Sequence, residues 1–223
     1  MSRIDTALVT GGSRGIGAAI VATLSGRGVD VIAPTRDELD LADLAEVEAY
    51  VQQLDRVPNV LVVNAGENLP RDLNSVTTDH WLRTMDVNLN SAFVLIRDLA
   101  PKMAANGGGW ITAVSSCYSL RSRRGRAPYS ASKAALNSLI KSAALEFAAA
   151  NVLVNGVAPG FVMTDLTRQN NDEQGIKDLE ARVPLGRLAE PSEIAQLVGY
   201  LSGPMNTYIT GQLFVIDGGF LCQ

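Results

Sequence analysis

Histidine and cysteine are scarce in this chain, and their scarcity removes whole classes of mechanism. The single histidine, His80, precedes Trp81 in a stretch that shows no pattern of a serine hydrolase triad, so that chemistry is not expected. The two cysteines, Cys117 and Cys222, are too few for a disulfide framework or a cysteine zinc site. We therefore predict two free thiols and no metal site.

Long apolar runs and excess positive charge are also lacking. No apolar run is long enough to span a bilayer, and the N-terminus, MSRIDTALVTGG, lacks the parts of a signal peptide. We therefore expect a cytoplasmic location and no membrane partner. The formal net charge of −4 argues against a nucleic-acid partner. A chain of 223 residues, 47% of them apolar, is expected to fold as a single domain over 1–223.

Short apolar runs alternate with longer helical patterns along the sequence. The expected strands are TALVT (6–10), DVIAPT (30–35), NVLVVN (59–64), GWITAVSS (109–116), VLVNGVAP (152–159) and GQLFVIDGG (211–219). The expected helices cover 15–28, 42–54, 78–86, 90–105, 128–150 and 191–203. This alternation predicts an α/β fold with a doubly wound parallel sheet and helices on both faces. Ligands of such sheets bind beyond the carboxyl ends of the strands.

A glycine-rich turn, TGGSRGIG, joins the first expected strand to the first helix. Gly11, Gly15 and Gly17 have the spacing G-x-x-x-G-x-G, which differs from the common G-x-G-x-x-G dinucleotide fingerprint. Glycine permits a tight turn and close approach of a pyrophosphate, and the helix N-terminus offers free N–H groups with partial positive charge. The turn therefore predicts a phosphate-binding site.

A tyrosine and a lysine are the second candidate site. Tyr129 and Lys133 are four residues apart on an expected helix, so they share one face. A free tyrosine has a pKa near 10, and proton transfer near neutral pH requires a pKa lower by about three, which corresponds to about 4 kcal/mol. A neighbouring ammonium helps to lower it. Ser116, thirteen residues before Tyr129, and Asn88 complete an ordered set.

Three further motifs accompany the glycine turn and the tyrosine–lysine pair: NAG (64–66), DVNL (86–89) and VNGVAPGFVMT (154–164). With all of these motifs, the chain resembles the short-chain dehydrogenase/reductase family from Thr10 to Gly219. The resemblance implies a Rossmann-type sheet, about seven strands in number, and a nicotinamide cofactor. It makes Tyr129 the general acid/base for hydride transfer between a carbonyl and an alcohol. Lys133 would lower the pKa of Tyr129 and hold the ribose. Ser116 would bind the substrate oxygen, with Ser115 as the competing candidate, and Asn88 would hold a water molecule beside the lysine.

The resemblance also implies a cofactor site along the carboxyl edge of the sheet. The expected cofactor-binding residues are Gly11, Ser13, Arg14, Gly15, Ile16, Gly17, Thr35, Arg36, Asp40, Leu41, Asn64, Ala65, Gly66, Tyr129, Lys133, Pro159, Gly160, Val162 and Thr164. Thr35 takes the place of the acidic residue that selects NAD, and Arg36 and Arg14 are cations suited to a 2′-phosphate. NADP is therefore favoured over NAD, unless both arginines are solvated or pair with Asp37 or Glu38. The helix that usually follows the second strand is expected to be missing, because TRDELDLAD leads directly to Asp40.

The substrate is less closely defined by the sequence. A small carbonyl or alcohol is the first expectation, and a 3-oxoacyl-carrier-protein or acyl-CoA substrate is the alternative, weakened by the absence of Lys and Arg from 104–110 and 147–152. A non-catalytic NADP-binding regulatory or scaffold protein is an alternative of another class. The polar segment after Thr164 resembles the mobile lid of the family, and the resemblance implies a homo-oligomer, with a tetramer favoured.

Four arginines lie in the loop between the serine and the tyrosine. They are Arg121, Arg123, Arg124 and Arg126. One or two of them would recruit an anionic substrate, such as a carboxylate or a phosphate. In the alternative interpretation, the loop is solvated or forms ion pairs at a subunit interface.

Overall fold

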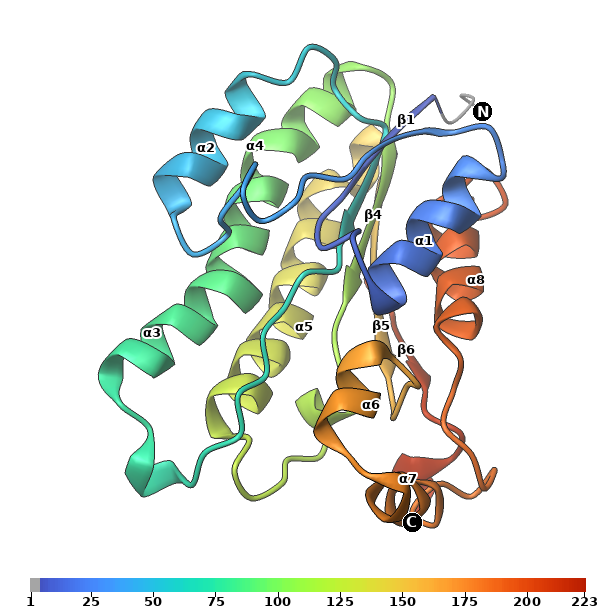
Figure 1. Ribbon diagram of the computed structural model, residues 1–223. Helices are drawn as coiled ribbons and strands as arrows, with labels where there is room; N and C mark the ends of the chain where they lie inside the picture. The colour runs from blue at the N-terminus through green and yellow to red at the C-terminus, as the bar shows by residue number, and fades with distance from the viewer. Residues whose placement is uncertain (1–4) are drawn as a thin grey trace.

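The computed structural model describes residues 5–223 and contains one parallel sheet in the order β2-β1-β3-β4-β5-β6 (Figure 1). The strands are β1 (Thr6–Val9), β2 (Asp30–Ile32), β3 (Val60–Val63), β4 (Gly109–Val114), β5 (Val152–Pro159) and β6 (Leu213–Ile216). The predicted α/β fold with a doubly wound parallel sheet is confirmed. The sheet has six strands, one for each apolar run, where the resemblance implied about seven.

Helices cover both faces of this sheet (Figure 1). They are α1 (Gly15–Ser25), α2 (Leu44–Gln52), α3 (Thr78–Met85), α4 (Ser91–Ala105), α5 (Ala127–Phe147), α6 (Asp165–Asn170), α7 (Glu173–Glu180) and α8 (Pro191–Leu201). One face carries α2, α4 and α5, and the other carries α1 and α8. The short helices α6 and α7 lie beyond the carboxyl ends of the strands. Among the described residues, none of the helices combines the length and the apolar character that crossing a membrane requires.

The strands are apolar on both sides because both sides are covered. In β3, Leu61 and Val63 pack into the core formed with α2, α4 and α5, whereas Val60 and Val62 pack into the core formed with α1 and α8. Successive side chains of a strand point to opposite faces, so a sheet buried on both faces needs an unbroken apolar run. This requirement explains why the four central strands, β1, β3, β4 and β5, could be found from sequence, whereas the edge strands β2 and β6 are more exposed.

A π-helical turn at Asp86–Asn90 joins α3 to α4, where the sequence indicated two separate helices. Its central residue, Asn88, is 1% exposed. The Asn88 amide accepts a hydrogen bond from the Glu67 N–H (2.8 Å) and donates one to the Glu67 carbonyl (3.0 Å). A π turn inserts one extra residue into a helix and often occurs at functional sites. Here it coincides with the tether between Asn88 and the loop that follows β3.

The chain runs from β2 to α2 without an intervening helix, as the sequence predicted. Two turns remain: the N–H groups of Glu38 (3.2 Å) and Leu39 (3.0 Å) donate to the Thr35 carbonyl in the first, and the Asp43 N–H donates to the Asp40 carbonyl (3.0 Å) in the second. Leu39 and Leu41 are buried in the core under α2 and α4. These two leucines anchor the shortened connection to the body of the protein.

The segment predicted as a polar lid contains the two short helices that sequence reasoning missed. Thr164 begins α6 by accepting the Thr167 N–H (3.2 Å), and Asp172 begins α7 by accepting the Gly175 N–H (2.8 Å). Side-chain caps of this kind stabilise the first turn of a helix. The helices were missed because their sequences are polar and short, so apolar periodicity gave little signal.

Candidate active site

The candidate site lies at the carboxyl ends of the central strands. Sheet order reverses between β1 and β3, because β2 lies on one side of β1 and all later strands lie on the other. Connections leave this point toward opposite faces and open a crevice between the loops, which is where doubly wound sheets bind ligands. The loop of 10–14 follows β1 and the loop of 64–66 follows β3 at this crevice.

The glycine turn is packed too tightly for any other residue. A Cβ on Gly17 would lie 1.9 Å from the Gly11 carbonyl oxygen, and a Cβ on Gly11 would lie 2.9 Å from the Ala65 Cα. Gly11 (φ +64) and Gly15 (φ +54) also adopt the left-handed conformation that favours glycine. The three glycines therefore allow β1, α1 and the loop after β3 to approach one another closely.

Asn64 holds the turn in place. Its side-chain amide donates to the carbonyls of Thr10 and Gly11, each at 3.1 Å. The N–H groups of Asn64 and Ala65 both donate to the Thr10 hydroxyl at 3.1 Å. The structure therefore brings the predicted Asn64 and Ala65 against the glycine turn, with the Asn64 side chain committed to the protein.

The start of α1 is suited to a phosphate group. The N-cap residue, Arg14, makes no side-chain capping bond, and the first turn carries no acidic residue. The backbone N–H groups of the first turn of α1 therefore remain free to donate to an anion. The helix dipole also favours negative charge at this end. Ser13 and Arg14 are exposed beside this end, whereas Ile16 packs against the core formed with α8. The glycine turn and the uncapped start of α1 together fit the pyrophosphate of a dinucleotide.

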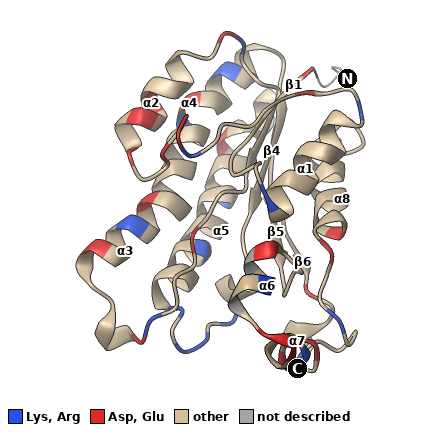
Figure 2. Ribbon diagram, in the orientation of Figure 1, with Lys and Arg blue, Asp and Glu red and all other residues tan. Residues whose placement is uncertain are grey.

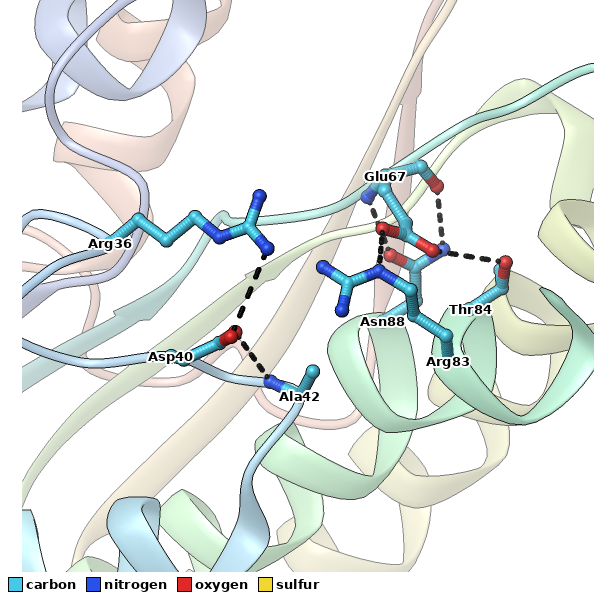
Figure 3. A network of polar contacts seen from close by, with 7 residues as sticks. All are labelled: Arg36, Asp40, Ala42, Glu67, Arg83, Thr84 and Asn88. Carbon is cyan, nitrogen blue, oxygen red and sulfur yellow. Dashed lines mark hydrogen bonds and ion pairs between the residues drawn. The ribbon is translucent and has the colours of Figure 1, made fainter. Parts of the chain in front are cut away.

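The residues predicted for the adenosine end are engaged with their own neighbours. Both the N–H and the hydroxyl of Thr35 donate to the Glu38 carboxylate, at 2.7 and 3.0 Å, and these bonds hold the pKa of Glu38 below its usual value. Arg36 forms an ion pair with Asp40 at 3.8 Å, and Asp40 also accepts the Ala42 N–H at 3.0 Å (Figure 3). The arginine therefore pairs with Asp40 and not with either of the carboxylates considered in the alternative interpretation.

Glu38 was not among the predicted site residues. The pattern T-x-x-E at 35–38 is the signature of a capping box, in which a glutamate reaches back to the N–H three residues earlier. That signal was present in the sequence. It was overlooked because no helix was expected there.

The loop after β5 forms the opposite wall. Of the predicted residues, Pro159 ends β5, and Gly160, Val162 and Thr164 lie on this loop. A Cβ on Gly160 would lie 2.7 Å from the Asp217 Cα, so glycine is needed where β5 passes the end of β6. A Cβ on Gly15 would lie 3.2 Å from the Thr164 methyl group, which places this wall beside the glycine turn. The Val162 side chain is buried under the loop.

Lys133 is buried at the junction of β4 and α5. Its ammonium donates to the Val114 carbonyl at 2.8 Å, the residue is 3% exposed, and burial lowers its pKa to about 8. A Cβ on Gly66 would lie 3.2 Å from the Asn88 side-chain oxygen and 3.4 Å from the Lys133 nitrogen. The absence of a side chain at Gly66 thus lets Asn88 and Lys133 approach the same stretch of backbone.

Glu67 fixes this stretch and was missed by sequence reasoning. Its carboxylate pairs with Arg83 (3.2 Å) and accepts the Thr84 hydroxyl (3.3 Å), while its backbone is held by Asn88 (Figure 3). The Asn88 amide also donates to the Ser132 hydroxyl at 3.1 Å, which links the cluster to α5. The available signal was an acidic residue directly after NAG, but its partners come from α3 and could not be paired with it by spacing.

The two candidate serines have different roles in the structure. Ser115 donates to the Asn137 side chain (2.6 Å) and is turned toward α5. Ser116 accepts the Tyr118 N–H (3.1 Å) at the start of a short 3-10 helix and lies close enough to Tyr129 to lower the pKa of its phenol. The structure therefore brings Ser116, and not Ser115, to the tyrosine hydroxyl.

Opposing effects act on the pKa of Tyr129. Burial raises the pKa of its phenol, while the hydrogen bond to Ser116 and the positive charge of Arg126 lower it. Cys117, buried next to this site, has its thiol pKa raised to about 11 by burial. Arg126 is thus a cation that lowers the pKa of Tyr129, a role that the sequence did not predict for it.

The four arginines of the loop do not form one group. Arg124 pairs with Asp72 through two hydrogen bonds (2.9 and 2.6 Å), and Arg123 is exposed. Arg121 lies over the Phe220 ring, and Arg126 is half-buried over the Tyr118 ring.

Comparison with known proteins identifies the family. A family model described as enoyl-(acyl carrier protein) reductase matches residues 36–221. The 3-oxoacyl-(acyl-carrier-protein) reductase of Vibrio cholerae is 36% identical, with 96% of each chain covered.

Solved structures agree with this sequence match. A blue fluorescent protein from a metagenomic library, in complex with NADPH, superposes with a TM-score of 0.88 at 34% identity, over 97% of each chain. A 4-hydroxyisoleucine dehydrogenase complexed with NADH superposes with a TM-score of 0.94 at 27% identity, over 98% of this chain and 99% of that one. The chain therefore belongs to the short-chain dehydrogenase/reductase family of NAD(P)-dependent oxidoreductases.

Proposed function

We propose that this protein interconverts a carbonyl and an alcohol with NADP(H), and that Tyr129 is the general acid/base. The observation that carries the proposal is the approach of Ser116 to the Tyr129 phenol, whose pKa it lowers, on the same side of the sheet as the buried Lys133 and the glycine turn. When bound, NADPH supplies the hydride that reduces the carbonyl. Gly11, Gly15 and Gly17 with the start of α1 would hold its pyrophosphate.

The side chains divide the remaining work. Tyr129 donates its proton to the oxygen of the carbonyl as that oxygen gains negative charge, and it removes the proton in the reverse reaction. Ser116 donates a hydrogen bond to the same oxygen. Lys133, with a pKa of about 8, exchanges protons near neutral pH far more readily than an ordinary lysine. Asn88 keeps the backbone after Gly66 against the lysine.

Mutation of the tyrosine tests this function. NADPH oxidation is measured with a panel of small ketones and aldehydes, for the wild type and for Tyr129→Phe. Removal of a general acid is expected to lower turnover by about 100- to 10,000-fold while NADPH binding, followed by nucleotide fluorescence, is retained. A Tyr129→Phe protein with near-wild-type turnover would refute the mechanism.

NADP is proposed as the cofactor, with Arg36 and Arg14 as the cations that would bind its 2′-phosphate. Arg36 is exposed and has only a long ion pair to Asp40, and Arg14 is exposed with no ion pair among residues 5–223. Glu38 opposes this choice, because its carboxylate occupies both donors of Thr35. We expect kcat/KM to be higher with NADPH than with NADH, and Glu38→Gln to increase that preference. A clear preference for NADH in the wild type would contradict the assignment.

A small carbonyl or alcohol is the proposed substrate, and a 3-oxoacyl group on a carrier protein is the second candidate. The second is favoured by the identity to the Vibrio cholerae 3-oxoacyl-(acyl-carrier-protein) reductase. It is opposed by the absence of Lys and Arg from the segments 104–110 and 147–152. Parallel assays with a free ketone and a 3-oxoacyl carrier protein distinguish them. Tight NADPH binding without turnover of either would favour a non-catalytic, regulatory role.

We also infer that the protein is a homo-oligomer, with a tetramer favoured. Leu145 on α5 is 84% exposed and Phe93 on α4 is 45% exposed. Pairing of two copies through this helical face would cover both. Light scattering after size-exclusion chromatography measures the state, and a monomer at micromolar concentration would contradict the inference.

A further inference from the structure

An aromatic cluster lies next to Tyr129. It consists of Tyr118, Phe161 and Phe220, with the ring of Phe161 centred 6.3 Å from that of Tyr118 and 5.0 Å from that of Phe220, both edge to face. Tyr129 packs against this cluster. The rings come from the loop after β4, the loop after β5 and the end of the chain. They therefore form an apolar wall beside the proposed general acid.

Arginines lie on the rings of this aromatic cluster. The guanidinium of Arg126 lies over Tyr118 (5.8 Å to the ring centre), that of Arg121 over Phe220 (5.4 Å), and that of Arg182 over Phe161 (5.1 Å). Figure 2 shows the basic positions gathered in the loop that leads into α5, at the lower end of the view. The wall is thus apolar in its rings and positive at its margin.

Arg126 stands apart from its neighbours in the loop. It is half-buried, and burial lowers the pKa of its guanidinium. Within residues 5–223 no carboxylate pairs with it, and its one side-chain hydrogen bond is to the neutral amide of Asn68. Arg124, two residues earlier, is exposed and paired with Asp72. Burying a cation without a counter-ion carries a desolvation cost, which a bound anion would offset.

The Tyr118 hydroxyl also lacks a polar partner. Tyr118 is 8% exposed, and its hydroxyl is buried without a hydrogen-bond partner in the part of the chain that the structure describes. Buried hydroxyls almost always have a partner, and one without it indicates a missing ligand or water. Arg126 interacts electrostatically with the phenols of both Tyr118 and Tyr129. An unpartnered donor and an unpaired cation therefore lie together beside the reacting group.

We propose that Arg126 and Tyr118 form a subsite for a carboxylate carried by the substrate. This inference rests on the proposed function, because it places the carboxylate beside the carbonyl that Tyr129 protonates. A planar guanidinium held against a ring presents its edge donors to a planar carboxylate, and the tyrosine hydroxyl adds a further bond. One forked guanidinium and one hydroxyl match the two oxygens of a carboxylate, which favours a carboxylate over a phosphate at this subsite. The substrate class is then oxo acids and the corresponding hydroxy acids.

The test compares each acid with its neutral ester. Acetoacetate is paired with ethyl acetoacetate, and levulinate with methyl levulinate, and kcat/KM is measured by NADPH oxidation. Wild type is expected to prefer the acid. In Arg126→Gln, kcat/KM for the acid is expected to fall about 10- to 100-fold relative to the ester, the range for a charge-assisted hydrogen bond. An effect of Arg126 on Tyr129 changes acid and ester alike, so it cancels in this ratio.

Two further variants and one control sharpen the result. Tyr118→Phe is expected to lower the acid-to-ester ratio about 3- to 10-fold, as for a neutral hydrogen bond. Arg126→Lys, which guards against misfolding of the glutamine variant, keeps the charge but loses the forked donors and is expected to lower the ratio less than Arg126→Gln. Arg124→Gln removes the same charge two residues away and is expected to leave the ratio unchanged. An equal fall in the ratio for Arg124→Gln and Arg126→Gln, or no fall in either, would overturn the subsite.

A binding measurement separates this inference from the proposed function. Thermal melting of the protein with NADPH is followed in the presence of levulinate or methyl levulinate. Stabilisation by levulinate alone, present in wild type and lost in Arg126→Gln, supports the subsite even if no carbonyl is reduced and the proposed function fails. Equal stabilisation of wild type and Arg126→Gln by levulinate would overturn the subsite while leaving the oxidoreductase proposal intact.

Discussion

Lys133→Met is expected to make the folded protein more stable at neutral pH while abolishing its reaction. Lys133 is 3% exposed, and burial lowers its pKa from 10.5 to about 8. Each pKa unit corresponds to about 1.4 kcal/mol, so keeping the ammonium buried below pH 8 costs about 3 kcal/mol. Methionine has a similar length and removes that cost. It also leaves the Val114 carbonyl without its donor, which costs about 1–2 kcal/mol. The net gain at pH 7 is about 1–2 kcal/mol.

The sign of this effect depends on pH. In the folded state Lys133 releases its proton near pH 8, whereas in the unfolded chain it does so near 10.5, so the unfolded state binds more protons between these values. Wild type therefore gains stability relative to Lys133→Met as the pH rises through that window. Above pH 10.5 the burial cost has vanished, and only the lost hydrogen bond remains. The variant should then be the less stable of the two, by about 1–2 kcal/mol.

Urea unfolding at fixed protein concentration, at pH 7, 8.5 and 10.5, measures the difference between the two proteins. Lys141→Met on the exposed side of the same helix is the matched control for the change of lysine to methionine. A constant difference for Lys133→Met across the three pH values would refute the reasoning. So would a large loss of stability at pH 7, because it would mean that the buried ammonium stabilises the fold.

Two further predictions concern the glycine turn and the segment around Glu67 that Asn88 holds. Gly17→Ala places a Cβ 1.9 Å from the Gly11 carbonyl oxygen, so we expect a loss of about 1–3 kcal/mol in urea unfolding and weaker NADPH binding. Gly26→Ala at the end of α1, where φ is −63, is the control and should change stability by less than about 1 kcal/mol. Glu67→Gln loosens the segment held by Asn88, so kcat should fall several-fold with little change in NADPH affinity. An unchanged kcat would show that Glu67 does not position Asn88.

The sequence predicted those parts of the fold and the site that depend on local pattern. The four central strands were found because burial on both faces requires continuous apolar runs, as in Val60–Val63. The glycine turn was found because the close approach of Gly17 to Gly11 excludes every larger residue. In both cases the structural requirement acts on residues that are adjacent or nearly adjacent in the chain.

What could not be predicted depends on partners that are distant in the sequence. Glu67 became interpretable only when α3 brought Arg83 to it, and the role of Ser115 became clear only when α5 brought Asn137. Arg126 could be distinguished from the other three arginines of the loop only by its burial over the Tyr118 ring, which sequence spacing does not reveal. Long-range packing decided these pairings, and single-sequence periodicity carries no information about it.

The shortened connection after β2 has a consequence for how copies of this protein can associate. It leaves β2 as one edge of the sheet, and an open edge strand can template the addition of another chain. This edge is only three residues long, and its first residue, Asp30, is charged, exposed and paired with Arg56. Such an edge is too short and too polar to recruit a neighbouring strand. We therefore expect any strand-to-strand association to involve the opposite edge, β6, where Val215 is exposed.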